Sequence, residues 1–225
     1  MERKIFNELT KQVETYILVK ELNRVNNGIF YLYTKESSKV VIKELINKID
    51  EEGQFEIDKE LYSYERLESL GIYIPKMTGY NREENIVIKE YLEGKDILGL
   101  IRDGGLSKDN FLELLRYAEL LNSDNLNIDY FPNNFIIKDE KLFYINYKVF
   151  PYTEELNLRN WGIYYWINSS GMRQYMETGD ESKINIIGKK NPIITDELNE
   201  KRDEIYLKYV EWKYGKDNEI GIREL

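Results

Sequence analysis

A short polar segment followed by two apolar runs constrains the fold of this chain more than any other feature. The segment reads Asn-Ile-Asp-Tyr-Phe-Pro-Asn-Asn, from Asn127 to Asn134. Asp129, Pro132 and Asn134 stand in it at positions 0, +3 and +5. The two apolar runs predict a strand, a turn and a second strand. This hairpin delivers a second polar residue, Asn146, 17 positions after Asp129.

Composition limits the chemistry that such a loop can perform. The chain has 225 residues, of which 42% are hydrophobic, enough for one sizeable core or for two small lobes that share a cleft. Cysteine and histidine are absent. Their absence excludes disulfides, thiolate metal sites, a histidine general base and histidine-ligated zinc. Any chemistry must therefore rest on carboxylates, lysines, amides, hydroxyls or a bound cation.

Charge and hydropathy narrow the expected partners. The 32 basic and 41 acidic residues give a formal net charge of −9. Because no basic block offsets that charge, nucleic acid and membrane surfaces are disfavoured as partners. No apolar run approaches the roughly 18 residues that a membrane-spanning helix needs, and the first seven residues lack the apolar region of a signal peptide. We therefore expect a cytoplasmic protein.

The first half of the chain predicts a small antiparallel sheet with one packed helix. A turn of the hairpin kind is expected over 25–28, and a helix over 57–70 that is closed by Gly71. The expected strands are 16–22, 29–34, 40–43, 73–75 and 85–90.

The second half predicts mainly helices around the polar loop and its hairpin. Ser107 can cap a helix whose apolar residues recur at three- and four-residue spacing. The hairpin turns over 138–141, and the Trp- and Tyr-rich segment 161–166 predicts a buried helix. A last helix is expected over 196–214, with Gly215 just past its end. Its predicted apolar face comprises Leu198, Ile205, Tyr209 and Trp212.

The order of these motifs resembles that of the protein-kinase-like superfamily, and is most similar to its aminoglycoside-phosphotransferase and choline-kinase branch. In that branch the catalytic loop reads roughly H-G-D-x-H-P-x-N and a later metal-binding motif reads I-D-F. This chain has the segment Asn127 to Asn134 at the first motif and Ile145-Asn146-Tyr147 at the second. The resemblance covers roughly residues 15–166, about two thirds of the chain.

The resemblance implies an α+β, two-lobed, protein-kinase-like fold. Residues 1–93 would form an N-terminal lobe with an antiparallel β-sheet and one helix. Residues 94–225 would form a small, mainly helical C-terminal lobe that includes the hairpin after the catalytic loop. Together the two lobes would make one kinase-like domain.

Two charged residues of the first lobe fit the same resemblance. Lys43 ends an apolar strand, as the lysine of the kinase V-A-I-K motif does, and Glu60 follows 17 residues later on the expected helix. Tyr64 and Leu67 lie at +4 and +7 from Glu60, so its carboxylate shares a face with apolar residues and needs a partner. The resemblance implies that Lys43 is this partner and that it reaches the nucleotide phosphates. The alternatives are a lysine at a solvated strand edge and a glutamate on the helix surface.

The segment 85–96 resembles the hinge between the two lobes of these kinases, an apolar strand followed by E-Y-x-x-G. By that resemblance, backbone groups of Glu90 and Leu92 hydrogen-bond to adenine, and Asp96 lies near the ribose. Lys89 departs from the pattern, because the family has an apolar residue there, at the back of the adenine pocket. Lys89 either replaces the lysine partner of the helix glutamate, or obstructs the pocket, or points to solvent if the register differs by one residue.

The same resemblance assigns roles to the polar loop and the hairpin. Asp129 would orient the acceptor hydroxyl, and Asn134 and Asn146 would hold Mg²⁺ against the phosphates of ATP. The family has an aspartate where Asn146 stands, and Mg²⁺ prefers anionic oxygen. An amide keeps the geometry but removes a charge beside the cation. Because rates fall tenfold for each ~1.4 kcal/mol added to the barrier, this loss would slow phosphoryl transfer by orders of magnitude.

Two functions therefore stay open. The first is a pseudokinase or a very weak ATP-dependent phosphotransferase that acts as a binding or regulatory module for a protein partner. It is favoured by the departures Gly28 (the single glycine of the phosphate loop), Lys89, Asn127 and Asn146. The second is an active divergent phosphotransferase that transfers the γ-phosphate of ATP to a hydroxyl of a small-molecule substrate or a protein. It is favoured by the intact residues Lys43, Glu60, Asp129 and Asn134.

Overall fold

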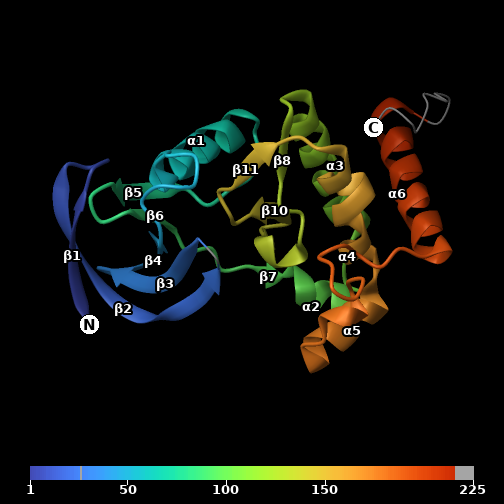
Figure 1. Ribbon diagram of the computed structural model, residues 1–225, viewed down its shortest axis with the longest axis horizontal. Coiled ribbons are helices and arrows are strands. Elements are labelled where there is room, and N and C mark those ends of the chain that lie inside the picture. The colour runs from blue at the N-terminus through green and yellow to red at the C-terminus, as the bar shows by residue number, and fades with distance from the viewer. Residues whose placement is uncertain (26, 216–225) are drawn as a thin grey trace. The chain divides into compact units, whose positions relative to one another are not determined.

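A computed structural model describes residues 1–25 and 27–215 of the chain. The chain divides into two compact units, Met1–Glu93 (unit 1) and Gly94–Leu225 (unit 2). Unit 1 is built on an antiparallel sheet and unit 2 contains most of the helices, so the fold is of the mixed α+β class that the sequence predicts (Figure 1). In the described part of the chain, no helix is long and apolar enough to cross a membrane.

The strands of unit 1 form one six-stranded sheet in the order β1-β2-β3-β4-β6-β5, in which all neighbours are antiparallel. The strands are β1 (Glu2–Asn7), β2 (Gln12–Val25), β3 (Gly28–Lys35), β4 (Ser38–Leu45), β5 (Met77–Asn81) and β6 (Ile86–Glu90). The hairpin expected between the first two predicted strands joins β2 to β3, where Val25 pairs with Gly28. Asn26, within the predicted turn, lies outside the described residues.

The sheet of unit 1 curls until its two outer strands meet. The backbone N–H of Glu8 donates to the carbonyl oxygen of Tyr80 (2.9 Å), and Asn81 Nδ2 donates to the carbonyl oxygen of Phe6 (2.8 Å). Side chains alternate between the two faces of a strand, so one set points into the curl. That set is an apolar core of this unit: Ile5, Tyr16, Tyr33, Val40, Ile42, Ile86 and Ile88.

Helix α1 (Glu56–Ser69) follows β4 and precedes β5. Its buried residues recur at three- and four-residue spacing and are Ile57, Glu60, Ser63 and Leu67. Gly71 ends the helix with a φ of +70°, a conformation that glycine adopts without strain. The N–H groups of Gly71 and Ile72 donate to the carbonyl oxygens of Glu68 (3.0 Å) and Leu67 (3.1 Å), which satisfies the last turn.

Unit 1 departs from the sequence prediction in two places. Residues 73–75 are not a strand, and β5 begins only at Met77. Pro75 has no N–H to contribute to a strand ladder, and the N–H of Lys76 donates instead to the carboxylate of Glu90 (2.8 Å). Strand β1 has no predictive signal either, because its sequence, ERKIFN, begins with three charged residues and is short.

Unit 2 contains both helices and short strands. The helices are α2 (Ile97–Arg102), α3 (Lys108–Ser123), α4 (Ile163–Ile167), α5 (Ser169–Thr178) and α6 (Asp196–Tyr214). The strands are β7 (Lys95–Asp96), β8 (Leu126–Ile128), β9 (Phe135–Lys138), β10 (Lys141–Tyr144) and β11 (Val149–Pro151). They form one sheet in the order β10-β9-β7 and a separate pair, β11-β8.

Local sequence signals explain where these elements begin and turn. Ser107 caps α3 in a capping box with Asn110, as its position in the sequence predicts. The hairpin of β9 and β10 turns through Asp139 and Glu140, whose φ angles are +49° and +64°. Two consecutive residues with positive φ are the mark of a type I′ turn, which suits a two-residue hairpin.

The core of unit 2 is aromatic. The predicted buried helix within 161–166 is confirmed as α4, all of whose residues are buried. Trp166 Nε1 donates to the carbonyl oxygen of Tyr130 (2.7 Å), and its ring meets the ring of Phe135 edge-on at 5.1 Å between centroids.

The predicted apolar face of α6 is partly wrong. Its buried residues are Leu198, Tyr206, Tyr209 and Val210. Trp212 is 55% exposed, and Ile205 is only half-buried. The C-terminal half of this helix has large apolar or aromatic residues around most of its circumference, so its periodicity does not single out one face.

Candidate functional site

Lys43 and Glu60 form a buried ion pair in unit 1. Lys43 stands near the end of β4 and Glu60 lies in the second turn of α1, and both are nearly inaccessible to solvent, at 3% and 4% exposure. Lys43 Nζ donates to Glu60 Oε1. Glu60 Oε2 is buried and has no hydrogen-bond partner among the described residues. The partner that the sequence suggests for Glu60 is therefore the one it has.

Gly28 makes room for the side chain of Lys43. A Cβ atom at Gly28 would lie 2.9 Å from Lys43 Cε and 3.1 Å from the carbonyl oxygen of Glu44. Real Cβ contacts of 2.9 Å are essentially not seen, so any larger residue here would displace the lysine. Gly28 thus has a packing function in unit 1, and its place in a phosphate loop stays a prediction.

Lys89 shares the buried space around this pair. The strand register places Val41 opposite Lys89 and Phe30 opposite Lys43, so both lysines lie on the same face of the sheet. Their Nζ atoms are 5.3 Å and 5.4 Å from the centroid of the Phe30 ring. Burial lowers the pKa of Lys89 to about 7, and the charge of Lys43 lowers it too, against the opposing effect of Glu60.

The three alternatives for Lys89 can now be separated. It does not point to solvent, since only 5% of it is exposed. It does not replace Lys43 as the hydrogen-bonded partner of Glu60. Obstruction of an adenine pocket stays a prediction.

The hinge residues occupy three different environments. Glu90 ends β6, and its backbone N–H is already engaged with the carbonyl oxygen of Lys76 (2.9 Å). Leu92 is buried, and no hydrogen bond joins its backbone to another described residue. Asp96, in unit 2, is exposed and caps α2 by accepting from the N–H groups of Leu98 (3.2 Å) and Gly99 (2.9 Å). Of the three residues that the resemblance assigns to nucleotide binding, Leu92 is the one whose backbone has no hydrogen bond to a described residue, and its role stays a prediction.

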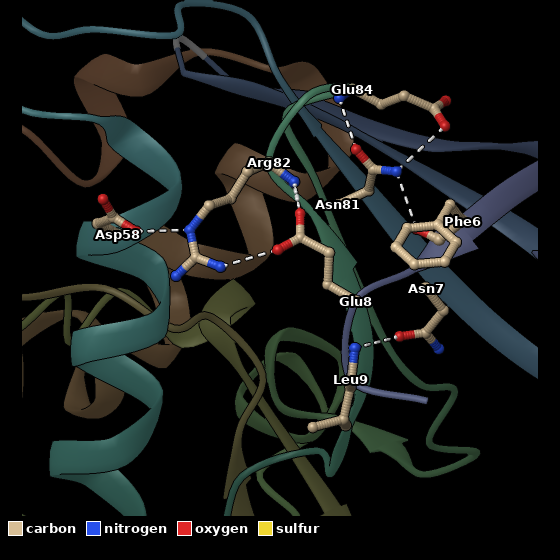
Figure 2. Close-up of polar contacts among 8 residues, drawn as sticks. All are labelled: Phe6, Asn7, Glu8, Leu9, Asp58, Asn81, Arg82 and Glu84. Carbon is tan, nitrogen blue, oxygen red and sulfur yellow. Dashed lines mark hydrogen bonds and ion pairs between the residues drawn. The ribbon is translucent and has the colours of Figure 1, made fainter. Parts of the chain in front are cut away.

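Arg82 connects α1 to the curled edge of the sheet (Figure 2). Its guanidinium donates to Asp58 on α1 (3.2 Å) and to Glu8, which directly follows β1 (3.0 Å). Asp58 lies two residues before Glu60, so Arg82 helps to hold the turn of α1 that carries the buried carboxylate. The sequence gives no sign of this contact, because it depends on the unpredicted strand β1.

In unit 2, the polar loop brings Asp129 and Asn134 together. The loop leaves the buried strand β8, and Asp129 Oδ1 accepts from the N–H of Phe131 (3.0 Å). Pro132–Asn134 then form a short 3₁₀ turn, in which Asn134 Nδ2 donates to the carbonyl oxygen of Asp129 (3.2 Å). Asp129 also lies near Tyr165, whose pKa is raised by burial and by the charge of this carboxylate.

Asn146 follows the hairpin and is tied to the same loop. The N–H of its neighbour Ile145 donates to the carbonyl oxygen of Asn134 (2.8 Å). Asn127, at the other end of the loop, is buried, and its Nδ2 donates to the carbonyl oxygen of Thr153 (3.3 Å). Asn127 is thus part of the packing around the loop.

The donor set of this loop matches a magnesium ion poorly. Asp129 supplies a carboxylate, whereas Asn134 and Asn146 supply neutral amide oxygens. Among residues 1–25 and 27–215, no group of three or more acidic side chains is gathered as a metal site. Mg²⁺ is normally held by one or two carboxylates together with substrate phosphates. Only a weak site is available from these residues.

No model of a known protein family matches the chain, and a search of curated proteins found no match.

Proposed function

We propose that this chain is a kinase-like module that has lost efficient phosphoryl transfer and acts as a binding or regulatory protein. The observation that carries this proposal is the buried ion pair of Lys43 and Glu60. Burying two charges is costly, and a pair placed between a strand and a helix is what a phosphate-directed lysine requires.

The neighbours of this pair in unit 1 support the same reading. The lysine strand β4 lies directly beside β6, which leads into the hinge segment, and α1 follows β4 in the chain. The lysine, the helix glutamate and the hinge strand are thus adjacent within one unit. Leu92, with backbone groups not bonded to described residues, has the property that adenine recognition needs.

The donor set of unit 2 argues for lost catalysis. The loop keeps Asp129 and Asn134 in one hydrogen-bonded turn. Asn146 contributes no charge to hold a metal ion beside the phosphates, and rates fall by orders of magnitude when several kcal/mol of such stabilisation is missing. A protein with these residues is better suited to binding than to turnover.

One observation favours the second candidate, an active phosphotransferase for a small-molecule or protein hydroxyl. Asp129 Oδ1 accepts from the N–H of Phe131, whereas Oδ2 has no hydrogen bond to any described residue. A carboxylate fixed through one oxygen and open at the other is suited to orient an acceptor hydroxyl.

A thermal-shift titration with ATP tests the two candidates. Ligand binding raises stability by mass action, by about 2.7 kcal/mol at a hundred times the Kd. We expect a small shift that depends little on Mg²⁺ or Mn²⁺ in the wild-type chain, and a larger, metal-dependent shift in Asn146→Asp. ATP turnover should stay at background.

Two results would contradict the proposal. Turnover in the wild-type chain that disappears in Asp129→Ala would establish the active enzyme instead. If ATP does not shift the midpoint of thermal unfolding of either the wild-type chain or Asn146→Asp, the protein does not bind the nucleotide and this part of the proposal is wrong. The variant Asp124→Ala, at an acidic residue that precedes β8 and ends α3, serves as the matched control for Asp129→Ala.

A further inference from the structure

Unit 2 contains a cavity of about 250 Å³ that the polar loop residues Asp129, Asn134 and Asn146 do not line. Helices α3 and α6 form two of its walls, and the segment after β11 forms a third. Its lining includes Leu115 and Ala118 from α3, Tyr206 from α6, Tyr152, Arg159 and the loop residue Tyr130. Its volume lies just below the 300–1,000 Å³ of sites for drug-sized ligands, so it suits a small molecule with a single ring or a short chain.

Two tyrosine hydroxyls at this cavity have no protein partner. Tyr130 is 1% exposed and Tyr206 is 4% exposed, yet neither hydroxyl forms a hydrogen bond with any residue of the described part of the chain. Neither oxygen is among the fully buried side-chain atoms that lack a partner, which are Asp50 Oδ2 and Glu60 Oε2, so both hydroxyls remain accessible at the cavity. Tyr206 and Tyr152 also contribute to the raised pKa of Tyr130, and all three residues line this cavity. Burial raises the pKa values of Tyr130 and Tyr206, which keeps both hydroxyls protonated as donors.

Two arginines and one acidic residue lie at the end of the cavity where Tyr206 lies. Asp203 forms an ion pair with Arg202 (2.8 Å) and a longer one with Arg159 (3.9 Å), so the three side chains together carry one net positive charge. The guanidinium carbon of Arg159 is 4.9 Å from the centroid of the Tyr206 ring. Burial raises the pKa of Tyr206, and the positive charges of Arg159 and Arg202 oppose this effect because a nearby cation favours the phenolate. The acidic lining residue Glu119 is already neutralised, since it accepts from Tyr209 and pairs with Lys213.

We propose that this cavity binds a small organic carboxylate with an apolar body. The carboxylate would accept hydrogen bonds from the hydroxyls of Tyr130 and Tyr206 beside the charge of Arg159. Charge-assisted hydrogen bonds of this kind are the strong ones. The apolar body would pack against Leu115 and Ala118. This inference does not depend on the kinase-like function, because every group in it belongs to unit 2 and none is a loop residue assigned to catalysis.

Benzoate is a suitable probe, and benzamide is its neutral counterpart of the same shape. Thermal-shift and calorimetric titrations of the full chain should show benzoate binding, with benzamide at least tenfold weaker. Tyr130→Phe and Tyr206→Phe keep the rings and remove only the hydroxyls, so each should weaken benzoate binding severalfold and the double variant should abolish it. Tyr175→Phe, on α5 and outside the cavity, should bind as the wild-type chain does.

Three outcomes would overturn the inference. They are no binding of benzoate or of the longer phenylacetate, equal binding of benzoate and benzamide, and unchanged benzoate binding in the double variant. If a tyrosine variant fails to fold, Ala118→Leu replaces it. That substitution fills the cavity from α3 with an apolar side chain, and benzoate binding that survives in it would place the ligand elsewhere.

Discussion

Two lysines and one glutamate share a space from which water is excluded, beside the ring of Phe30. Lys43 has the hydrogen bond to Glu60, and Lys89 lies in the same buried region with its pKa lowered to about 7. If both lysines are protonated, one carboxylate must compensate two positive charges. Among Lys43, Glu60 and Lys89, the buried charge of Lys89 is therefore the one that destabilises the folded chain most.

Replacing Lys89 by methionine should stabilise unit 1 in a pH-dependent manner. The unfolded chain keeps the proton on Lys89 up to its ordinary pKa of 10.5, whereas the folded chain loses it above about pH 7. Unfolding therefore takes up a proton between these two values, and wild-type stability rises with pH across that window. Below pH 7 the burial penalty is fully present. The free energy of unfolding of Lys89→Met should thus exceed that of the wild-type chain by on the order of 3 kcal/mol at pH 6. This difference should shrink as the pH approaches 10.

Urea unfolding at several pH values between 6 and 10 measures this difference. Lys20→Met, at an exposed lysine of β2, is the control and should show no such trend. A gain for Lys89→Met that is constant with pH would show that packing, and not the charge, is responsible.

The same three residues predict an asymmetry between two substitutions. Glu60→Leu removes the carboxylate that is bonded to Lys43 and that lies near Lys89, and removing one partner of a buried pair costs about 3–5 kcal/mol. Lys43→Met leaves Lys89 as a cation near Glu60, so it should cost less. The free energies of unfolding at pH 6, where Lys89 is protonated, measure both. Glu65→Leu, at an exposed site of α1, should stay within about 0.5 kcal/mol of wild type, and an equal cost for the two buried substitutions would refute the argument.

At the scale of the elements, the short strand β1 does more than extend the sheet of unit 1. It closes the curl of the sheet and contributes Ile5 to the core. Glu8, which follows it, accepts a hydrogen bond from the guanidinium of Arg82 (Figure 2). The ion pairs of Arg82 with Glu8 and Asp58 are largely exposed on the arginine side. Exposed pairs contribute about 0–1 kcal/mol, so the apolar contacts of β1 must provide most of its attachment.

Ile5→Ala should accordingly destabilise the chain by about 2–5 kcal/mol, the range for deleting most of a buried isoleucine side chain. Ile5 is fully buried, whereas Val13 on the neighbouring strand is 66% exposed. Val13→Ala is therefore the matched control and should change stability by less than about 0.5 kcal/mol. Thermal or denaturant unfolding measures both, and similar effects at the two sites would mean that β1 is only loosely attached.

Periodicity and turn signals predict most elements of this chain, and the failures have specific causes. The strand that carries Lys43, the helix that carries Glu60 and the cap at Ser107 all have strong local signals. β1 has none, because its pairing with β2 and its contact with β5 are tertiary. In α6 the aromatic residues leave the phase of the buried face ambiguous, so periodicity does not identify Tyr206 as buried.

The candidate sites were predictable to different degrees. The pairing of Lys43 with Glu60 follows from a polar residue on an apolar helix face. The cavity with Tyr130 and Tyr206 leaves no such signal, because its lining comes from segments far apart in the sequence and tyrosine is common in this chain. A buried tyrosine without a hydrogen-bond partner is visible only in three dimensions.

For the whole molecule, the net charge of −9 is the dominant global property. A net charge far from zero destabilises the compact state through self-repulsion, and added salt screens that repulsion. The midpoint of thermal unfolding should therefore rise as sodium chloride is raised from about 20 mM to about 300 mM, a range over which the Debye length shortens severalfold.

A variant with less net charge provides the comparison. Glu51→Lys combined with Glu52→Lys, both at exposed positions, replaces two negative charges with two positive ones and brings the formal charge from −9 to −5. It should respond less to salt than the wild-type chain. If salt instead lowers the midpoint of the wild-type chain, attractive surface pairs outweigh the repulsion.

The contact between β1 and β5 also affects the tendency of this protein to aggregate. Strands at the margin of a sheet expose backbone donors and acceptors to which another chain can add, and this is a route to fibrils. Here part of that margin is capped from within, by the hydrogen bonds from Glu8 and Asn81. The N-terminal residues thus reduce aggregation through the edge of the sheet. A bulky tag fused to them would disturb these hydrogen bonds and favour aggregation.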